Sequence, residues 1–361
     1  MFFREQNYGQ FSGHSPCEYA QVDVGVRLLQ ELAQNGKSVV ISPLSVSAAL
    51  FALYLATNDK TKTQLKKFLG RIIDKQENDY TLSLANRLYV RQDSSVKDGY
   101  DRLFQFHFGG EKIRSFSCTE KEQLEVNEWI SNRTNNKITH VISSKKIYSL
   151  TKMLLVSTID FKGVWEKQFQ KNITQNAPFY ISRNETKNMS MMQITDDFPY
   201  YEDDFAQVIK LPYIGHKLEM IIILPKIRFG YSDVLRNITA VNLLNYVINA
   251  VPTRITLRLP MFQVKGKMNL KKSLKKIGIA RIFAEKADFG QLTDDPIYIS
   301  NVTHAAFIQV DEKGTQSTPA KITELEHSIK KADMLFSVDH PFLFAVVKDA
   351  TTVLFAGQYV T

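Results

Sequence analysis

Apolar residues recur every three or four positions through much of the first 150 residues, which is the period of an amphipathic helix. Pro43 is expected in the first turn of one such helix, because a proline there lacks only an N–H that has no helical partner. Asn35 and Gly36 are expected to end the helix before it. The predicted helices cover 18–34, 43–56, 60–75, 76–87 and 124–138, with a short buried strand at 38–43.

After residue 150 the pattern changes to runs of β-branched and aromatic residues, which are typical of buried strands. Because helices and strands are segregated along the chain, the fold class is predicted as α+β. No Gly/Ser- or Pro-rich linker divides the 361 residues, so a single domain is expected over 1–361. The predicted strands cover 153–161, 205–214, 217–226, 254–264, 304–310 and two runs at the C-terminal end.

The net charge of +9 favours acidic partners such as a glycosaminoglycan. Lysines gather on two amphipathic patterns, KTKTQLKKFLGRIIDK at 60–75 and NLKKSLKKIG at 269–278. One interpretation is two helices with solvated basic faces. The other is a polyanion site formed by Lys62, Lys66, Lys67, Arg71, Lys271, Lys272, Lys275 and Lys276.

Local motifs for enzymatic chemistry are missing from the sequence. It has no GxGxxG, GxSxG or HExxH pattern, and the GKS at 36–38 lacks the upstream glycine of a phosphate-binding loop. Cys17 and Cys118 are too few for a disulfide framework and form no zinc motif, so free thiols are expected. Neither an enzyme nor a cofactor or metal site is therefore predicted, and no apolar run is long enough to span a membrane.

Two features bear on the compartment. The N-terminal residues lack the apolar region of a signal peptide, which fits a cytoplasmic protein or a mature secreted one. The sequence also carries six N-x-S/T sequons, which favour a secreted glycoprotein. The expectation is therefore secretion, with the cytoplasm as the alternative. The sequons start at Asn132, Asn172, Asn184, Asn188, Asn237 and Asn301.

Seven blocks of the sequence, in order, resemble the serpin family. They are SVVISPLSVSAALFALYLATNDKTKTQL (38–65), ANRLYV (85–90), VNEWISNRTNNKITHVIS (126–143), LLVSTIDFKGVWEKQF (154–169), LRLPMFQVKGKMNLKKSLKKIGIARIF (257–283), ISNVTHAAFIQVDEKGT (299–315) and HPFLFAVVKDATTVLFAGQYV (340–360).

The resemblance implies a fold of three β-sheets, about eight to nine helices and an exposed reactive loop near the C-terminus. The long polar segment, about 312–338, would be that loop. A serpin loop is cleaved by a target serine protease and then inserts as a new strand into a β-sheet, which traps the acylated protease. The implied partner is a trypsin-like or chymotrypsin-like protease, and the chain is expected to be a monomer that binds no nucleic acid.

The resemblance also assigns the hinge, where the chain changes from loop to strand. Gly314 supplies backbone freedom, and the next residues are small enough to slip between strands. Alternation would bury every second residue from Thr315. Two of these are awkward, since Pro319 lacks an N–H and Lys321 would carry a charge inward. The hinge residues are Glu312, Gly314, Thr315, Ser317, Thr318 and Ala320.

The scissile bond has two assignments. The usual family spacing from Glu312 places it between Ser328 and Ile329. Counting back from the strand after the loop gives Lys330 instead, and Lys330 or Lys331 would suit a trypsin-like protease.

Two further groups are implied by the resemblance. Ser42, Ser45, Ser157 and His304 match the shutter, a buried polar cluster beneath the strands that part. The family usually has an asparagine where this chain has Ser157. Trp165 matches the breach, at the top of the opening sheet.

The leading hypothesis is a protease inhibitor that acts as a suicide substrate. The alternative is a non-inhibitory serpin: a substrate, carrier, chaperone or polyanion-binding module. Pro319 and Lys321 favour the alternative, because both oppose insertion.

Overall fold

The computed structural model describes residues 16–69, 81–117, 119–142, 151–315 and 334–360. Within these ranges there are eight α-helices and three short 3-10 helices. The α-helices are α1 (Pro16–Leu32), α2 (Pro43–Ala56), α3 (Asp59–Lys66), α4 (Asp98–His107), α5 (Glu120–Arg133), α6 (Tyr231–Asn237), α7 (Ala240–Ile248) and α8 (Lys271–Lys276), and the 3-10 helices are η1 (Ala33–Asn35), η3 (Lys171–Ile173) and η4 (Arg281–Phe283).

The strands fall mostly after residue 150, as predicted. They are β1 (Val39–Ile41), β2 (Thr81–Arg91), β3 (Arg114–Phe116), β4 (Met153–Val164), β5 (Gln175–Ser182), β6 (Glu185–Glu202), β7 (Ala206–Pro212), β8 (Leu218–Pro225), β9 (Val251–Pro260), β10 (Phe262–Asn269), β11 (Ile299–Asp311), β12 (Gly314–Thr315), β13 (Met334–Ser337), β14 (Phe342–Lys348) and β15 (Thr352–Tyr359). The α+β prediction is confirmed.

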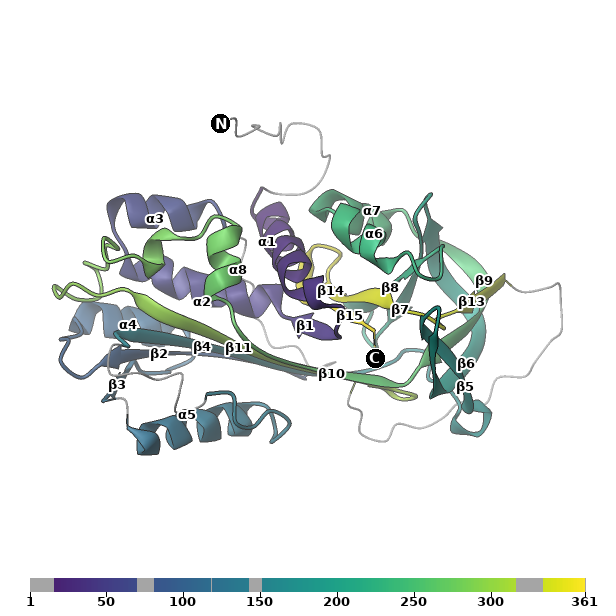
Figure 1. Cartoon of the computed structure of the whole chain (residues 1–361), viewed down its shortest axis with the longest axis horizontal. Coiled ribbons are helices and arrows are strands. Elements are labelled where there is room, and N and C mark those ends of the chain that lie inside the picture. The colour runs from purple at the N-terminus through teal and green to yellow at the C-terminus, as the bar shows by residue number, and fades with distance from the viewer. Residues whose placement is uncertain (1–15, 70–80, 118, 143–150, 316–333, 361) are drawn as a thin grey trace.

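The strands form two hydrogen-bonded networks. One is a six-stranded sheet in the order β10-β11-β12-β4-β2-β3, which runs along the length of the molecule (Figure 1). The other has nine strands in the order β1-β15-β14-β8-β7-β6-β9-β13, with β5 also paired to β6. The three expected sheets appear as two networks because the 18-residue β6 pairs with β5 and β9 along most of its length and with β7 at its end.

The six-stranded sheet is covered on both faces. On one face, Leu154 and Val156 of β4 pack with Trp129 and Ile130 of α5. On the other face, Leu155 lies in the core that includes α1 and α2. Figure 1 shows α5 on one side of the sheet and α2, α3 and α8 on the other. Because both faces are covered, the nine residues Met153–Phe161 of β4 are all buried, whereas a strand with one solvated face would alternate between buried and exposed residues.

One predicted element is wrong. A helix was expected over 76–87, but residues 81–91 form strand β2, and 76–80 lie outside the described residues. β2 pairs antiparallel with β4 from Thr81 to Val90. The spacing of its apolar residues suits either structure, so tertiary pairing decided between them.

The single strand expected over 254–264 is two strands in the structure, β9 and β10. They are separated at Met261, which belongs to neither the β6–β9 ladder nor the β10–β11 ladder and whose N–H donates to the Ser190 carbonyl.

Candidate functional site

Strands β4 and β11 meet along a seam. We call the end at Met153 and Ile299 its lower end and the end at Val164 and Val310 its upper end. The two strands pair directly at the lower end, and β12 lies between them at the upper end. Over Ile299–Ala306 of β11 the two strands pair directly and in parallel. Above this stretch the two-residue β12 lies between them and pairs antiparallel with both. Thr315 lies opposite Val310 on β11 and Gly163 on β4. The predicted hinge thus enters the sheet for one pair of residues.

Gly314 occupies a position where a side chain has no room. Its φ of 142° lies in a region that L-residues rarely adopt. A Cβ added there would lie 2.2 Å from the Gly163 carbonyl oxygen. The predicted need for glycine at 314 therefore has two physical causes, backbone conformation and close approach to β4.

Thr315 is completely buried, and its hydroxyl forms a 2.7 Å hydrogen bond with the Tyr213 hydroxyl. The Tyr213 ring stacks on Trp165, with ring centroids 4.5 Å apart. The Trp165 indole Nε1 donates to the Asp311 carbonyl oxygen at 3.0 Å. Burial raises the pKa of Tyr213 far above its usual value, so the phenol stays protonated. Trp165 therefore lies beside β12, at the end of the seam away from the direct β4–β11 pairing, and its assignment to the breach stays a prediction.

The turn between β11 and β12 is held by the segment that follows β4. The Trp165 N–H donates to the Lys313 carbonyl at 3.0 Å, and the Phe169 N–H donates to the Glu312 carbonyl at 2.9 Å. Glu312 is 7% exposed, and its carboxylate accepts a hydrogen bond from the Thr174 hydroxyl at 3.1 Å. A buried carboxylate needs such a partner. Glu312 is thus hydrogen-bonded through both its backbone and its side chain to the segment that follows β4.

The four residues assigned to the shutter lie together below the hinge, and all are buried. The Ser42 N–H donates to Nε2 of His304 at 3.0 Å, which joins the start of α2 to β11. The Ser42 hydroxyl accepts from the Ser45 N–H at 3.0 Å and so caps the helix. The Ser45 hydroxyl is hydrogen-bonded to the Ser157 hydroxyl on β4. One helix end is therefore bonded to both strands of the seam.

His304 is neutral in this cluster. Burial lowers its pKa to about 4, and the nearby Ser157 backbone, which raises it, only partly offsets this. A neutral ring can accept the hydrogen bond from the Ser42 N–H, whereas a protonated ring cannot. Its Nδ1 has no hydrogen-bond partner of ordinary geometry among the described residues.

Asn86 was missed by the sequence reasoning. It lies on β2 directly opposite Ser157, is 2% exposed, and has no hydrogen-bond partner for either side-chain polar atom within the described part of the chain. The cluster thus has an asparagine on the strand beside the one where the family pattern placed it. An amide inside the apolar run of 84–90 was the available signal. Tyr213 gave no comparable signal, because its partners come from distant segments.

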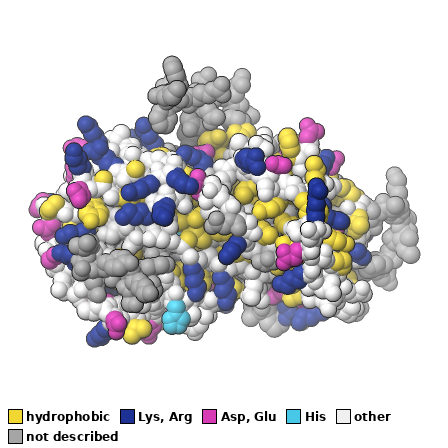
Figure 2. Space-filling view, viewed as in Figure 1, with side chains coloured by type: hydrophobic (Ala, Val, Ile, Leu, Met, Phe, Trp, Pro, Cys, Tyr) yellow, Lys and Arg dark blue, Asp and Glu magenta, His cyan; other side chains and the backbone are white. Residues whose placement is uncertain are grey.

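The predicted basic residues lie on α3 and α8. Lys66, Lys67, Lys272 and Lys275 are exposed, and Figure 2 shows Lys and Arg side chains gathered over this part of the molecule. The two helices are neighbours, since Gln64 Oε1 of α3 accepts from the Arg281 N–H at 2.7 Å just after α8. Lys276 Nζ forms an ion pair with Glu31 Oε2 at 2.7 Å. Burial, and then the charge of Lys275, lower the pKa of Lys271.

Several predicted site residues lie outside the described residues. They are Arg71, Ser317, Thr318, Ala320, Ser328, Ile329, Lys330 and Lys331, together with Pro319 and Lys321. The same holds for Cys118 and for the side chain of Cys17. In the described ranges no helix combines the length and apolar composition needed to cross a membrane. Nor does any group of three His, Cys, Asp or Glu in that part of the chain lie in position to hold a metal ion.

Comparison with known proteins places this chain in one family. The model of the family Serpin (serine protease inhibitor) matches residues 19–361. The chain belongs to the serpin family. It is 30% identical to leukocyte elastase inhibitor A of Mus musculus, over 91% of this chain and 94% of the relative. It is 29% identical to serpin B6 of Macaca fascicularis, over 92% of this chain and 96% of the relative.

Solved structures show the same fold. The chain superimposes on native protease nexin-1, crystallised with heparin, with a TM-score of 0.86. The match covers 96% of this chain and all of that one, at 24% sequence identity. At this identity the likeness establishes the fold alone.

Proposed function

We propose that this chain inhibits a serine protease as a suicide substrate. The protease serine attacks the carbonyl carbon of the scissile bond, proposed at Ser328-Ile329, and the new amine leaves with Ile329. The acylated loop then enters the seam between β4 and β11 and carries the protease with it. Family membership and the two relatives named as a serpin and an elastase inhibitor support this proposal.

One observation carries the proposal: Gly314 and Thr315 already lie between β11 and β4, and the strands pair directly below them. On this proposal these two residues are the start of the inserted strand, and their pairing sets its register. Each further residue that enters replaces the direct pairing of β4 with β11 at that position, and its own backbone pairs with both strands. Strand addition of this kind gains main-chain hydrogen bonds along both edges.

The register also bears on the awkward Lys321. If insertion continues from Thr315 opposite Gly163, Lys321 comes to lie between Ser157 on β4 and His304 on β11. It then faces the shutter, beside the unpaired amide of Asn86. Asn86 Oδ1 and the serine hydroxyls can accept hydrogen bonds from an ammonium, so the lysine would enter a polar site rather than an apolar one.

The proposal predicts a covalent complex with a target protease. The chain is incubated with trypsin, chymotrypsin and elastase and then run on a denaturing gel. An inhibitor gives a band that survives SDS near the sum of the two masses, and mass spectrometry of the released C-terminal peptide locates the bond. The control is the same protease with its active-site serine blocked. A clipped chain without a complex, with every protease, would favour the non-inhibitory alternative.

A polyanion-binding role is the second candidate, and the exposed lysines of α3 and α8 favour it. No ion pair joins Lys272 or Lys275 to a carboxylate in the described ranges, whereas Lys276 is paired with Glu31. Heparin bound to protease nexin-1 shows that one protein of this fold binds a polyanion.

Replacing Lys272 and Lys275 with glutamine is expected to lower the salt concentration at which the chain elutes from heparin. The expected loss of binding free energy for heparin is about 1 kcal/mol per lysine, as for a lysine near an anionic membrane surface. The matched control replaces the exposed Lys171 and Lys187, which lie outside this patch. If the two double variants elute from heparin at the same salt concentration, the result counts against a polyanion site on α3 and α8.

The expected secretion and glycosylation have no support from the names of the relatives, so both stay predictions, with the cytoplasm as the alternative. The sequon asparagines at 132, 172, 184, 188 and 237 are exposed, and Asn301 is half-buried. These five are therefore accessible to a glycosyltransferase in a secreted chain.

A further inference from the structure

The seam must open along its whole length if the loop inserts. In the register that starts with Thr315 opposite Gly163, Leu325 would lie opposite Met153, the first residue of β4. The direct pairing of β4 with β11 over Ile299–Ala306 would then be replaced entirely. β4 and β11 would move apart by about one strand spacing, roughly 4.8 Å. Any short contact that crosses the lower end of the seam must break.

Two chain segments meet at that lower end. Residues 92–97 follow β2, which pairs with β4 through ten residue pairs and so belongs to its side of the seam. Residues 288–298 precede β11 and are anchored to the connection between α2 and α3. There, the Asn58 N–H donates to the Asp288 carbonyl at 3.2 Å, and the Gln291 side chain donates to Asn58 Oδ1 at 2.8 Å.

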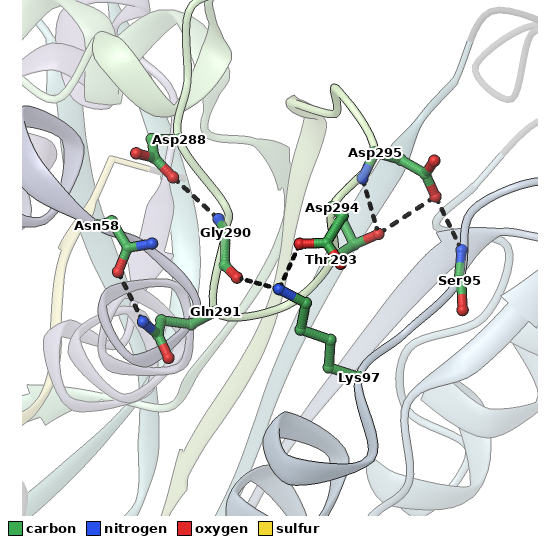
Figure 3. Close-up of polar contacts among 9 residues, drawn as sticks. All are labelled: Asn58, Ser95, Lys97, Asp288, Gly290, Gln291, Thr293, Asp294 and Asp295. Atoms are coloured by element: carbon green, nitrogen blue, oxygen red, sulfur yellow. Dashed lines mark hydrogen bonds and ion pairs between the residues drawn. The ribbon is translucent and has the colours of Figure 1, made fainter.

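Four hydrogen bonds join these two segments, three of them drawn in Figure 3. Lys97 Nζ donates to the Gly290 carbonyl at 2.8 Å and to Asp294 Oδ1 at 2.5 Å. The Lys97 N–H donates to the Leu292 carbonyl at 2.8 Å. The Ser95 N–H donates to Asp295 Oδ2 at 2.9 Å.

The Asp295 carboxylate is oriented by hydrogen bonds with Thr293 in the same turn. The Thr293 hydroxyl donates to Asp295 Oδ2 at 3.2 Å and accepts from the Asp295 N–H at the same distance. The carboxylate is therefore oriented before it receives the Ser95 N–H. Figure 3 shows Lys97 reaching toward Gly290 and Asp294 from one side, while Gln291 is held by Asn58 on the other.

We propose that this group of contacts, the base clamp, holds the lower seam closed and sets the rate at which the sheet opens. The base clamp consists of Ser95, Lys97, Gly290, Leu292, Asp294 and Asp295. Hydrogen bonds of 2.5–2.9 Å do not survive an added separation of roughly 4.8 Å. They stabilise the closed native chain and are absent once the sheet has opened. The inference rests on the proposed loop insertion.

The test follows the uptake of a fluorescent peptide with the sequence of 315–328, which competes for the seam without any protease. Lys97→Met removes the ammonium and keeps most of the aliphatic stem. Uptake is expected to be about threefold to tenfold faster, because hydrogen bonds to a charged group are lost from the closed state only. The matched control is Lys226→Met, which removes an ion pair with Glu202 at 3.2 Å, where Glu202 ends β6 and Lys226 directly follows β8.

A second variant guards against a folding defect. Asp295 is exposed, so Asp295→Ala removes only the acceptor for the Ser95 N–H and the turn contact. It is also expected to speed uptake, while Lys97→Arg, which keeps a donor, is expected to stay near the wild-type rate. Wild-type rates in both Lys97→Met and Asp295→Ala would overturn the base clamp alone. No uptake by the wild type, with no gain in heat resistance after loop cleavage, would overturn loop insertion and the base clamp with it.

Discussion

Thr315→Arg is expected to abolish the covalent complex and leave a clipped chain. Thr315 is fully buried against Tyr213, and its backbone pairs with both strands of the seam. An arginine cannot occupy that volume, and burying its charge without a partner costs several kcal/mol. The hinge would leave the seam and insertion would start late. Hydrolysis of the acyl-enzyme would then be faster than loop insertion, and the protease would be released.

The measurement is the ratio of SDS-stable complex to clipped chain for each variant. Thr315→Ser is the matched control, because it keeps a small side chain with a hydroxyl for Tyr213, and it is expected to trap nearly as well as the wild type. Thr315→Val separates volume from the hydrogen bond. Undiminished trapping by Thr315→Arg would mean that the hinge is assigned to the wrong residues.

Acid is expected to destabilise the native chain through His304. The folded pKa is about 4, against 6.5 for an unperturbed histidine. Between these values the unfolded chain binds a proton that the native chain does not, so the free energy of unfolding falls as the pH falls from 6.5 to 4 and the loss is complete below 4. At 1.36 kcal/mol per pKa unit, the loss is about 3 kcal/mol.

Urea midpoints of the wild type and of His304→Gln, taken from pH 7 to pH 4, measure this contribution. Carboxylates titrate in both chains, so the difference in slope isolates the histidine. The variant is expected to lose less stability on acidification than the wild type. His216→Gln is the matched control, because it replaces a histidine whose side chain is 70% exposed and lies outside the shutter. Parallel slopes for wild type and His304→Gln would show that His304 is not buried neutral.

Patterning predicted much of the local structure. The strand predicted over 153–161 is confirmed as β4, and Pro43 opens α2 as expected. The blocks around Gly314 and Trp165 suggested a hinge and a breach by resemblance. The structure places Gly314 in β12, where it has no room for a Cβ, and Trp165 beside β12, where it stacks on Tyr213. Their roles in loop insertion stay predictions. By contrast, 81–87 was predicted helical and is a strand, since its spacing fits both periods and pairing with β4 decides.

The sequence by itself determined the α+β composition, because the period of the apolar residues sets helices and strands locally. The hinge and the shutter were assigned by the resemblance to the serpin family, and their roles stay predictions. The tertiary structure alone decided the contacts. It brought Tyr213 to Thr315, Asn86 to Ser157, and Lys97 to the segment before β11. Each pair joins segments far apart in sequence, and their meeting depends on strand register, which only the packed sheet specifies.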